Sequence, residues 1–219
     1  AFWAGGAIRR VPIGGGPVST VASGVADAPR GMASSASGEV FYDGADGVVW
    51  RASAERTKVP VTKRLDSEIL HALPALLPAE RVLLFTARHR QWTWGDEEVV
   101  AQRLDTGERK ALLRDATDAR YVPSGHLVFL RRGTLLAVPF DAARLEVRGD
   151  PVAVVERVRQ GITGGHGGDL TGAGHFSVSS NGTLAYLAGE VPPFTEREIV
   201  AIDRSGRLSP LPAPSRGYA

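Results

Sequence analysis

Short apolar runs that end on an aromatic residue recur along the chain and predict β-strands. These aromatic residues stand about 40 residues apart, with a longer last interval. They are Trp3, Tyr42, Phe85, Phe129 and Tyr186. A repeat of this length is typical of the blades of a β-propeller.

Turn residues separate the predicted strands, and turns and strands follow one another in the same order in each repeat. Three of the aromatic runs follow a turn that ends in glycine, at Ser37-Gly38, Ser124-Gly125 and Asn181-Gly182. A β-branched or leucine-rich strand is predicted after each run, over 7–11, 48–52, 98–104, 135–140 and 198–202. Further turns lead to last strands such as 18–22, 111–113 and 152–155. Four antiparallel strands in each repeat are the content of a propeller blade.

No helix of ordinary length is expected. The most helix-like stretch is Ser67 to Leu77, but Pro74 lies inside it, and proline costs about 3 kcal/mol in a helix interior. We predict that this stretch is a loop leading into the inner strand of the third blade.

The pattern predicts an all-β fold, a single β-propeller domain over 1–219 built from four-stranded antiparallel blades. About five blades are present, and the first lacks its inner strand. Their expected limits are 1–22, 23–65, 66–115, 116–157 and 158–219. This count indicates a fragment of a larger ring.

Composition and charge exclude several classes of function. The chain carries 26 basic and 24 acidic residues and no run of five Lys or Arg, which argues against a nucleic-acid partner. It has no cysteine, which excludes thiol catalysis and disulfides. The longest apolar run, Val82 to Phe85, is far too short to span a bilayer, so neither an anchor nor a signal segment is expected in this piece.

Catalytic and cofactor-binding patterns are not found either. No Gly-x-Ser-x-Gly nucleophile elbow occurs. Asp43, Asp46 and Asp203 stand in or beside turns, where aspartate accepts backbone hydrogen bonds. The glycine-rich segment 161–174 contains His166 and Asp169, but a structural metal site requires four well-placed ligands. We therefore expect no catalytic residue, no metal and no cofactor in this chain.

One region resembles a known family closely. It begins at 117–129 with TDARYVPSGHLVF and continues with GTLLAVPFD at 133–141, RLEV at 144–147 and GDPV at 149–152. Together with NGTLAY at 181–186, these residues resemble the TolB-like propeller attached to bacterial serine/threonine protein kinases. The likeness extends along most of the chain and is specific around 117–155. Two turns depart from the usual Ser-Pro-Asp-Gly-like pattern, at 35–38 and 77–80.

The resemblance implies a six-bladed ring, with a kinase domain and commonly a membrane-spanning segment upstream. No glycine-rich nucleotide loop, His-Arg-Asp loop or Asp-Phe-Gly triplet occurs here, so kinase activity would belong to sequence outside this chain. We expect a non-catalytic sensor or interaction module on the extracytoplasmic side of a bacterium, with contact to the membrane only through a missing upstream segment. Two alternatives are the gating propeller of a prolyl-oligopeptidase-like hydrolase and a free-standing envelope scaffold of TolB type.

Strand direction predicts which face binds the partner. In antiparallel blades, three long connections, 87–97, 161–174 and 188–196, fall on one face, which we call the loop face. The short glycine turns fall on the opposite, turn face. Because loops held by a rigid scaffold commonly carry recognition, we expect a protein, peptide or envelope component to bind the loop face.

The candidate partner-binding residues come from these three connections. They are Arg88, His89, Arg90, Trp92 and Trp94 in the first, His166 and Asp169 in the second, and Phe194 in the third. Exposed tryptophan beside arginine suits a protein or peptide partner. The competing interpretation is that Trp92 and Trp94, two positions apart on one strand face, cover the scaffold instead.

Overall fold

The computed structural model describes residues 1–25, 29–53, 57–89, 95–162, 171–179, 181–189, 200–202 and 205–210. Within them the chain forms strands β1–β20 and a single 3-10 turn, η1 (Pro78–Glu80). This all-β content confirms the predicted fold class. No helix in the described part of the chain is long and apolar enough to cross a bilayer.

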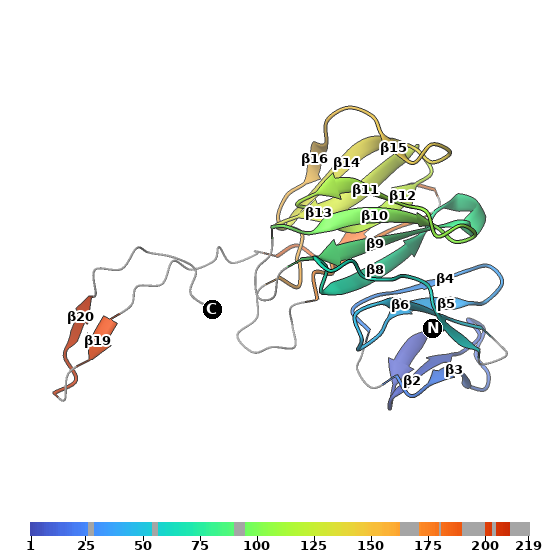
Figure 1. Ribbon diagram of the computed structural model, residues 1–219, viewed down its shortest axis with the longest axis horizontal. Coiled ribbons are helices and arrows are strands. Elements are labelled where there is room, and N and C mark those ends of the chain that lie inside the picture. Colours follow the sequence, from blue (N-terminus) through green and yellow to red (C-terminus); the bar gives the residue numbers. More distant parts are fainter. Residues whose placement is uncertain are drawn as a thin grey trace.

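Four sheets follow one another along the chain, each antiparallel (Figure 1). The first contains β1 (Phe2–Ala4), β2 (Ala7–Arg10) and β3 (Ser19–Ser23). The second contains β4 (Met32–Ser34), β5 (Val40–Asp43), β6 (Val49–Ala52) and β7 (Lys58–Pro60). The third contains β8 (Leu70–Leu76), β9 (Val82–Arg88), β10 (Glu98–Arg103) and β11 (Arg109–Arg114).

The fourth sheet has five strands. They are β12 (Thr117–Val122), β13 (His126–Arg131), β14 (Thr134–Asp141), β15 (Glu146–Val147) and β16 (Val152–Val155), and both β15 and β16 pair with β14. Two further pairs follow, β17 (Phe176–Val178) with β18 (Leu184–Tyr186) and β19 (Val200–Ile202) with β20 (Leu208–Pro210). Among the described residues these pairs are separate two-stranded sheets, not one four-stranded blade.

The repeated aromatic residues occupy equivalent strands, as predicted. Tyr42, Phe85 and Phe129 lie on β5, β9 and β13, each next to the inner strand of its sheet, while Trp3 lies on β1 and Tyr186 on β18. Tyr42, Phe85 and Phe129 all pack in the hydrophobic core between their own sheet and the sheet before it. Tyr42 packs against Ile8 and Val21 of the first sheet, and the other two belong to the cores shared with the sheet before their own.

Hydrophobic cores lie between successive sheets, because each central sheet buries both faces. On β9, Leu83 and Phe85 join the core with the second sheet, whereas Leu84 joins the core with the fourth. Burial on both faces explains why the run Val82 to Phe85 is apolar at every position instead of alternating.

The prediction of a loop over Ser67 to Leu77 is wrong, because residues 70–76 form the inner strand β8. Pro74 is accommodated at a β-bulge, where the register with β9 shifts between Ala72 and Ala75 and Leu73 has a φ of 55°. A residue in a bulge does not take part in the hydrogen-bond ladder between the strands, so the missing backbone N–H of Pro74 is tolerated there.

The inner strand of the fourth sheet carries an equivalent bulge. Its register with β13 shifts between Thr117 and Arg120, and Asp118 has a φ of 50°. The bulge lies opposite Phe129, as the bulge of β8 lies opposite Phe85. The repeat therefore extends to a backbone irregularity that turns the strand locally.

Candidate functional site

The connection between β9 and β10 starts and ends on a buried ion pair. Arg88 closes β9 and Glu97 precedes β10, and Arg88 Nε lies 4.0 Å from Glu97 Oε1. Glu97 is 2% exposed, and its Oε2 accepts a hydrogen bond of 2.8 Å from the Gly95 N–H. Burial raises the pKa of the Glu97 carboxyl and lowers the pKa of the Arg88 guanidinium. The charge of Arg88 acts to lower the Glu97 pKa, and the charge of Glu97 acts to raise the Arg88 pKa, so each partner opposes the effect of burial on the other.

A second arginine–carboxylate pair lies near the first. The buried Asp43, at the end of β5, accepts hydrogen bonds from the N–H groups of Arg30 and Gly31 and from Arg30 Nη1, at 2.9, 3.1 and 2.9 Å. Burial raises the pKa of Asp43, and these three donors act against that rise. Arg30 is close enough to Arg88 for its charge to lower the Arg88 pKa, so two cations share this part of the loop face.

A third pair stands at the bulge of β12. Asp118 accepts a hydrogen bond of 2.8 Å from the Gly174 N–H and one of 3.2 Å from Arg120 Nη2. Burial raises the Asp118 pKa. Arg120 donates to the Phe176 carbonyl at 2.8 Å, and its guanidinium lies 4.2 Å from the centre of the Phe176 ring. This pair therefore ties β12 to β17 across neighbouring sheets.

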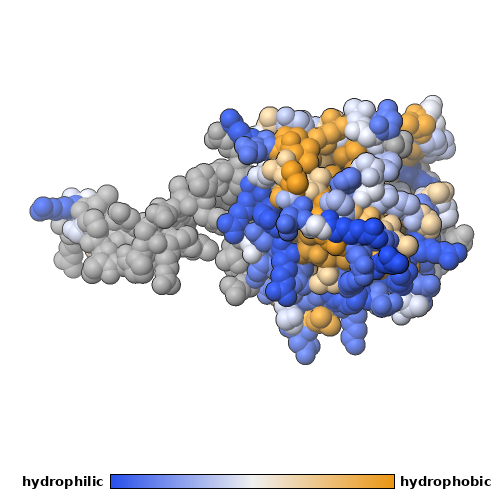
Figure 2. Space-filling view, turned by 90° about the horizontal axis from the view of Figure 1, so that it is seen from above, coloured by the Kyte–Doolittle hydropathy of each residue, from blue (hydrophilic) through white to orange (hydrophobic). Residues whose placement is uncertain are grey.

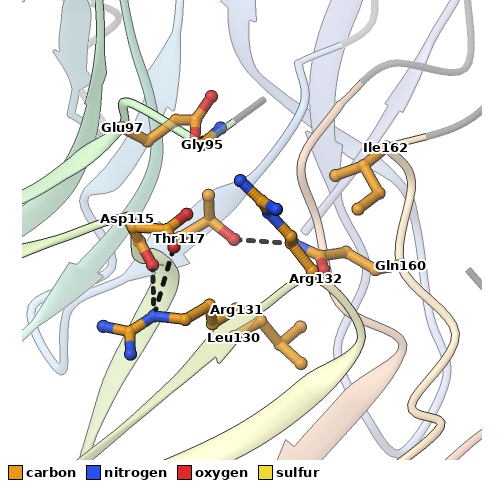
Figure 3. A pocket seen from close by; sticks show the side chains of 9 residues that line it. All are labelled: Gly95, Glu97, Asp115, Thr117, Leu130, Arg131, Arg132, Gln160 and Ile162. Atoms are coloured by element: carbon orange, nitrogen blue, oxygen red, sulfur yellow. Dashed lines mark hydrogen bonds and ion pairs between the residues drawn. The ribbon is translucent and has the colours of Figure 1, made fainter. Parts of the chain in front are cut away.

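A small cavity opens beside the first pair (Figure 3). Arg131 Nε donates to the Asp115 carbonyl at 2.9 Å, and Gln160 Nε2 donates to Thr117 Oγ1 at 2.7 Å. The cavity also reaches Gly95, Glu97, Leu130, Arg132 and Ile162. Its volume of about 10 Å³ is that of a single water molecule, so it does not hold an organic ligand.

A buried network that sequence reasoning missed resembles a catalytic triad in connectivity. His71 Nδ1 lies 2.9 Å from Thr62 Oγ1, and His71 Nε2 lies 2.9 Å from Glu68 Oε2. Burial lowers the His71 pKa, which favours a neutral ring that accepts from Thr62 and donates to Glu68. The ring is fully buried, and Thr62 Oγ1 also accepts from the Val49 N–H, so no substrate reaches this hydroxyl.

The neighbours of Glu68 stabilise its ionised form. Burial opposes ionisation, but hydrogen bonds from Arg109, the Leu65 N–H and His71 outweigh it and lower the Glu68 pKa to about 2. Arg109 comes from β11, while Glu68 and Leu65 belong to the linker before β8. The network thus connects the linker to the third sheet by hydrogen bonds and has a structural role.

The structure describes only part of the predicted site. Arg88 is buried in its ion pair, and His89 Nδ1 lies 3.1 Å from the Ser67 carbonyl, with Nε2 3.7 Å from Glu98 Oε2. The remaining candidates lie outside the described residues: Arg90, Trp92, Trp94, His166, Asp169 and Phe194. In the described part of the chain, no group of three or more His, Asp or Glu could hold a metal ion.

The buried carboxylates Asp43, Glu97 and Asp118 were not predicted as members of this site. Asp43 was interpreted as a turn residue, and Asp118 was quoted only for the family resemblance. A local pattern does not reveal such roles, since Glu97 depends on Arg88 across a connection and Asp118 depends on Gly174, far along the chain.

The fold, with its successive antiparallel sheets around inner strands, is that of a partial β-propeller. No protein-family model matches the chain, and no curated protein matches it. Solved β-propeller proteins are similar to it in structure at low sequence identity, and they show the fold alone.

Three of these structures illustrate the likeness. TolB from Acinetobacter baumannii is 18% identical with a TM-score of 0.54, over 93% of this chain and 48% of that one. The calcium-binding protein regucalcin from Agrobacterium tumefaciens is 14% identical with a TM-score of 0.57, over 93% and 65%. A puromycin-hydrolyzing peptidase from Mycobacterium tuberculosis is 11% identical with a TM-score of 0.50, over 90% and 42%. The chain therefore spans between about two fifths and two thirds of these proteins, and it matches part of a six-bladed ring.

Proposed function

We propose that this chain is a non-catalytic β-propeller module that binds a protein, peptide or envelope component on its loop face. We further propose that it is the ligand-binding region of a bacterial membrane-anchored serine/threonine kinase and acts on the extracytoplasmic side. The kinase part of the proposal rests on the resemblance over 117–155, which spans the fourth sheet.

The buried Arg88–Glu97 pair is the observation that carries the binding proposal. Both residues are buried at the two ends of the β9–β10 connection, next to Arg30 and Asp43. Connections that begin and end on a rigid scaffold commonly carry recognition residues. Arg90, Trp92 and Trp94 are the central residues of this connection in the sequence.

The test replaces both tryptophans, W92A/W94A, in the 219-residue chain. We expect binding to weaken by about 30-fold or more with an unchanged melting temperature, because a buried aromatic anchor contributes about 2 kcal/mol or more. Each protein is immobilised and exposed to the same detergent-solubilised bacterial envelope extract, and the retained proteins are quantified by mass spectrometry. Thr106→Ala, in the β10–β11 turn of the turn face, is the matched control and should retain the same proteins as the wild type.

Melting temperatures of the three proteins separate the two interpretations of the tryptophans. If W92A/W94A melts at a lower temperature but binds equally well per folded molecule, the rings cover the scaffold. That result would remove Arg88, His89, Arg90, Trp92 and Trp94 from the binding site.

A hydrolase propeller is the second candidate, favoured by the structural likeness to the puromycin-hydrolyzing peptidase. In that case the chain would gate a catalytic domain encoded next to it. A Gly-x-Ser-x-Gly elbow in the adjoining sequence would support this candidate, whereas an adjoining His-Arg-Asp loop and Asp-Phe-Gly triplet would support the kinase. A signal peptide directly before a complete propeller would instead support an envelope scaffold, which the likeness to TolB favours.

A further inference from the structure

Buried polar contacts hold the linker between β7 and β8, residues 61–69, against the sheets. The middle of this linker, residues 63–67, is exposed, and its one leucine, Leu65, is 54% exposed. Figure 2 shows hydrophilic residues spread over one side of the molecule, but Thr62 and Glu68, at the two ends of the exposed stretch, are buried. The attachment of this stretch therefore depends on the partners of these two side chains.

The linker also contacts the start of the β9–β10 connection. The Ile69 N–H donates to the Arg88 carbonyl at 2.8 Å, and His89 Nδ1 lies 3.1 Å from the Ser67 carbonyl. Glu68 stands between these two contacts in the sequence and binds the buried network with its carboxylate. A displacement of the linker would therefore remove support from the first two residues of the candidate binding connection.

The neutral ring of His71 satisfies both of its polar neighbours. Its Nδ1 accepts the hydroxyl proton of Thr62 at 2.9 Å, and Thr62 Oγ1 in turn accepts from the Val49 N–H at 2.9 Å. Its Nε2–H donates to Glu68 Oε2 at 2.9 Å. The ring is fully buried and packs against Phe85, with the ring centres 4.5 Å apart. Both ring nitrogens therefore have a partner in a site without water.

A second proton on the His71 ring disturbs this arrangement. Nδ1 becomes a donor, so it competes with a backbone N–H for the Thr62 oxygen, and the hydroxyl proton of Thr62 loses its acceptor. Burial is the main cause that lowers the pKa of His71, and the charges of Arg109 and Arg64 lower it further, whereas Glu68 acts in the opposite direction. The attached linker therefore favours the neutral ring.

Other charged groups on the strands packed against β8 belong to separate ion pairs. These strands are β4, β5, β6, β9 and β12. Their charged side chains each pair with another residue, and none is among the groups that shift the His71 pKa. They are Asp43, Arg51, Arg88, Asp118 and Arg120. The response of the ring to pH is therefore set by Glu68, Arg109 and Arg64.

We propose that His71 is a pH-sensitive switch: protonation of its ring in acid releases the linker at residues 62–69 and loosens the start of the β9–β10 connection. The effect on partner binding rests on the proposed function of this connection. The release of the linker does not, because it is a property of this chain alone.

The sign of the effect follows from the two forms of the ring. In the released form the ring regains water and its ordinary pKa of 6.5, whereas in the attached form the pKa is lower. The attached form therefore has its full stability above pH 6.5 and loses stability as the pH falls. The population of the released form rises by up to about tenfold for each pH unit below 6.5, until the attached ring is also protonated.

Hydrogen exchange of the 219-residue chain measures the release. The reporter amides are those of Val49, Leu65 and Ile69, which donate to Thr62 Oγ1, Glu68 Oε2 and the Arg88 carbonyl. After correction for the intrinsic pH dependence of exchange, their exchange should rise by up to about tenfold between pH 7.5 and pH 5.5. Strand β13 is the internal reference and should not change. Equal corrected rates at the two pH values would overturn the proposal.

Histidine variants identify the group that responds. His71→Gln keeps a donor and an acceptor but does not titrate, so the exchange of its linker should lose the pH dependence. The matched control, His126→Gln, changes the half-buried histidine of β13 that contacts Ser124 and should keep the full response. A response that persists in His71→Gln and disappears in His89→Gln would assign the switch to His89 and overturn the proposal.

The wild type alone decides the question if His71→Gln does not fold. Nuclear magnetic resonance of the His71 ring gives its pKa in the attached form, and exchange of the linker should stop rising near that pH. A ring that titrates at or above pH 6.5 would overturn the proposal. Retention of envelope proteins is measured at the same two pH values. Exchange that depends on pH with retention that does not would support the release and contradict the binding role of the connection.

Discussion

At the level of single residues, burial raises the pKa of three carboxylates, whereas the pKa of a fourth is lowered by its hydrogen-bond donors. Asp43, Glu97 and Asp118 lose solvent, and the cations and N–H donors around them compensate only partly, so their pKa values rise. Glu68 is also buried, but Arg109 and two further donors outweigh the loss of solvent. The contribution of Asp43, Glu97 and Asp118 to the stability of the fold therefore falls as the pH rises through their raised pKa values. The contribution of Glu68 grows as the pH rises from its lowered pKa.

Glu68→Gln tests this sign. The folded-state pKa of about 2 lies below the ordinary value of 4.5, so Glu68 stabilises the fold fully above pH 4.5 and loses this effect as the pH falls toward 2. At neutral pH the variant should be less stable by about 3 kcal/mol, because Arg109 is left without its buried partner. Thermal melting followed by circular dichroism from pH 7 to pH 2 should show a shallower loss of stability in the variant than in the wild type.

Glu146→Gln is the control for this experiment. Glu146 is half-exposed beside Lys110, and exposed ion pairs contribute less than about 1 kcal/mol. Parallel pH profiles for the wild type and Glu68→Gln would contradict the assigned role of Glu68.

At the level of elements, the bulges of the inner strands β8 and β12 both contact the preceding sheet. Leu73, at the bulge of β8, approaches the chain just before β4 so closely that a Cβ added to Gly31 would lie 2.9 Å from Leu73 Cα. Asp118, at the matching bulge of β12, donates its N–H to Thr86 Oγ1 of β9 at 3.1 Å. Each bulge therefore contacts the sheet before its own.

Gly31→Ala should destabilise the chain by about 1–3 kcal/mol, because the added methyl group meets backbone that is unable to rotate away. Urea unfolding measures the difference. Gly14→Ala is the matched control, since an added Cβ there meets nothing within 4 Å. Both substitutions reduce the freedom of the unfolded chain, so the difference between the two variants reports the contact with Leu73. Equal unfolding midpoints would show that β4 and β8 separate at little cost.

At the level of the whole molecule, the sheets cover only part of a ring. The chain spans 48% of TolB and 65% of regucalcin, and its first sheet consists of β1, β2 and β3. In the second and third sheets an inner strand pairs with the strand that corresponds to β1. Among the described residues no strand pairs with this edge of β1, and an edge left unpaired favours pairing with another chain.

We expect the isolated 219-residue chain to self-associate, measured as a molar mass above that of the monomer in light scattering coupled to gel filtration. Phe2→Lys, which places a charge on exposed β1, should reduce the association, since charged residues protect sheet edges. A monodisperse wild-type monomer across the accessible concentrations would contradict this expectation and indicate that the ring has closed.

Local sequence determined the strands, the turns and the repeat of this protein. Turn residues and strand-forming runs act over a few neighbours, so Ser37-Gly38, Ser124-Gly125 and the recurrent aromatic residues were sufficient to predict antiparallel blades. The same reasoning predicts that the β9–β10 connection lies on the loop face. The candidates Arg88 and His89 lie at its start, while the proposed role of its tryptophans awaits the binding experiment.

Only the tertiary structure decided which polar groups meet and where a strand tolerates proline. Pro74 excluded a helix, but its place in β8 depends on a bulge opposite Phe85, which local sequence does not specify. Glu68 meets Arg109 across 41 positions of sequence, and Asp118 meets Gly174 across 56. Contacts of this range depend on how the sheets pack, because the sequence near each residue does not specify a partner so far along the chain.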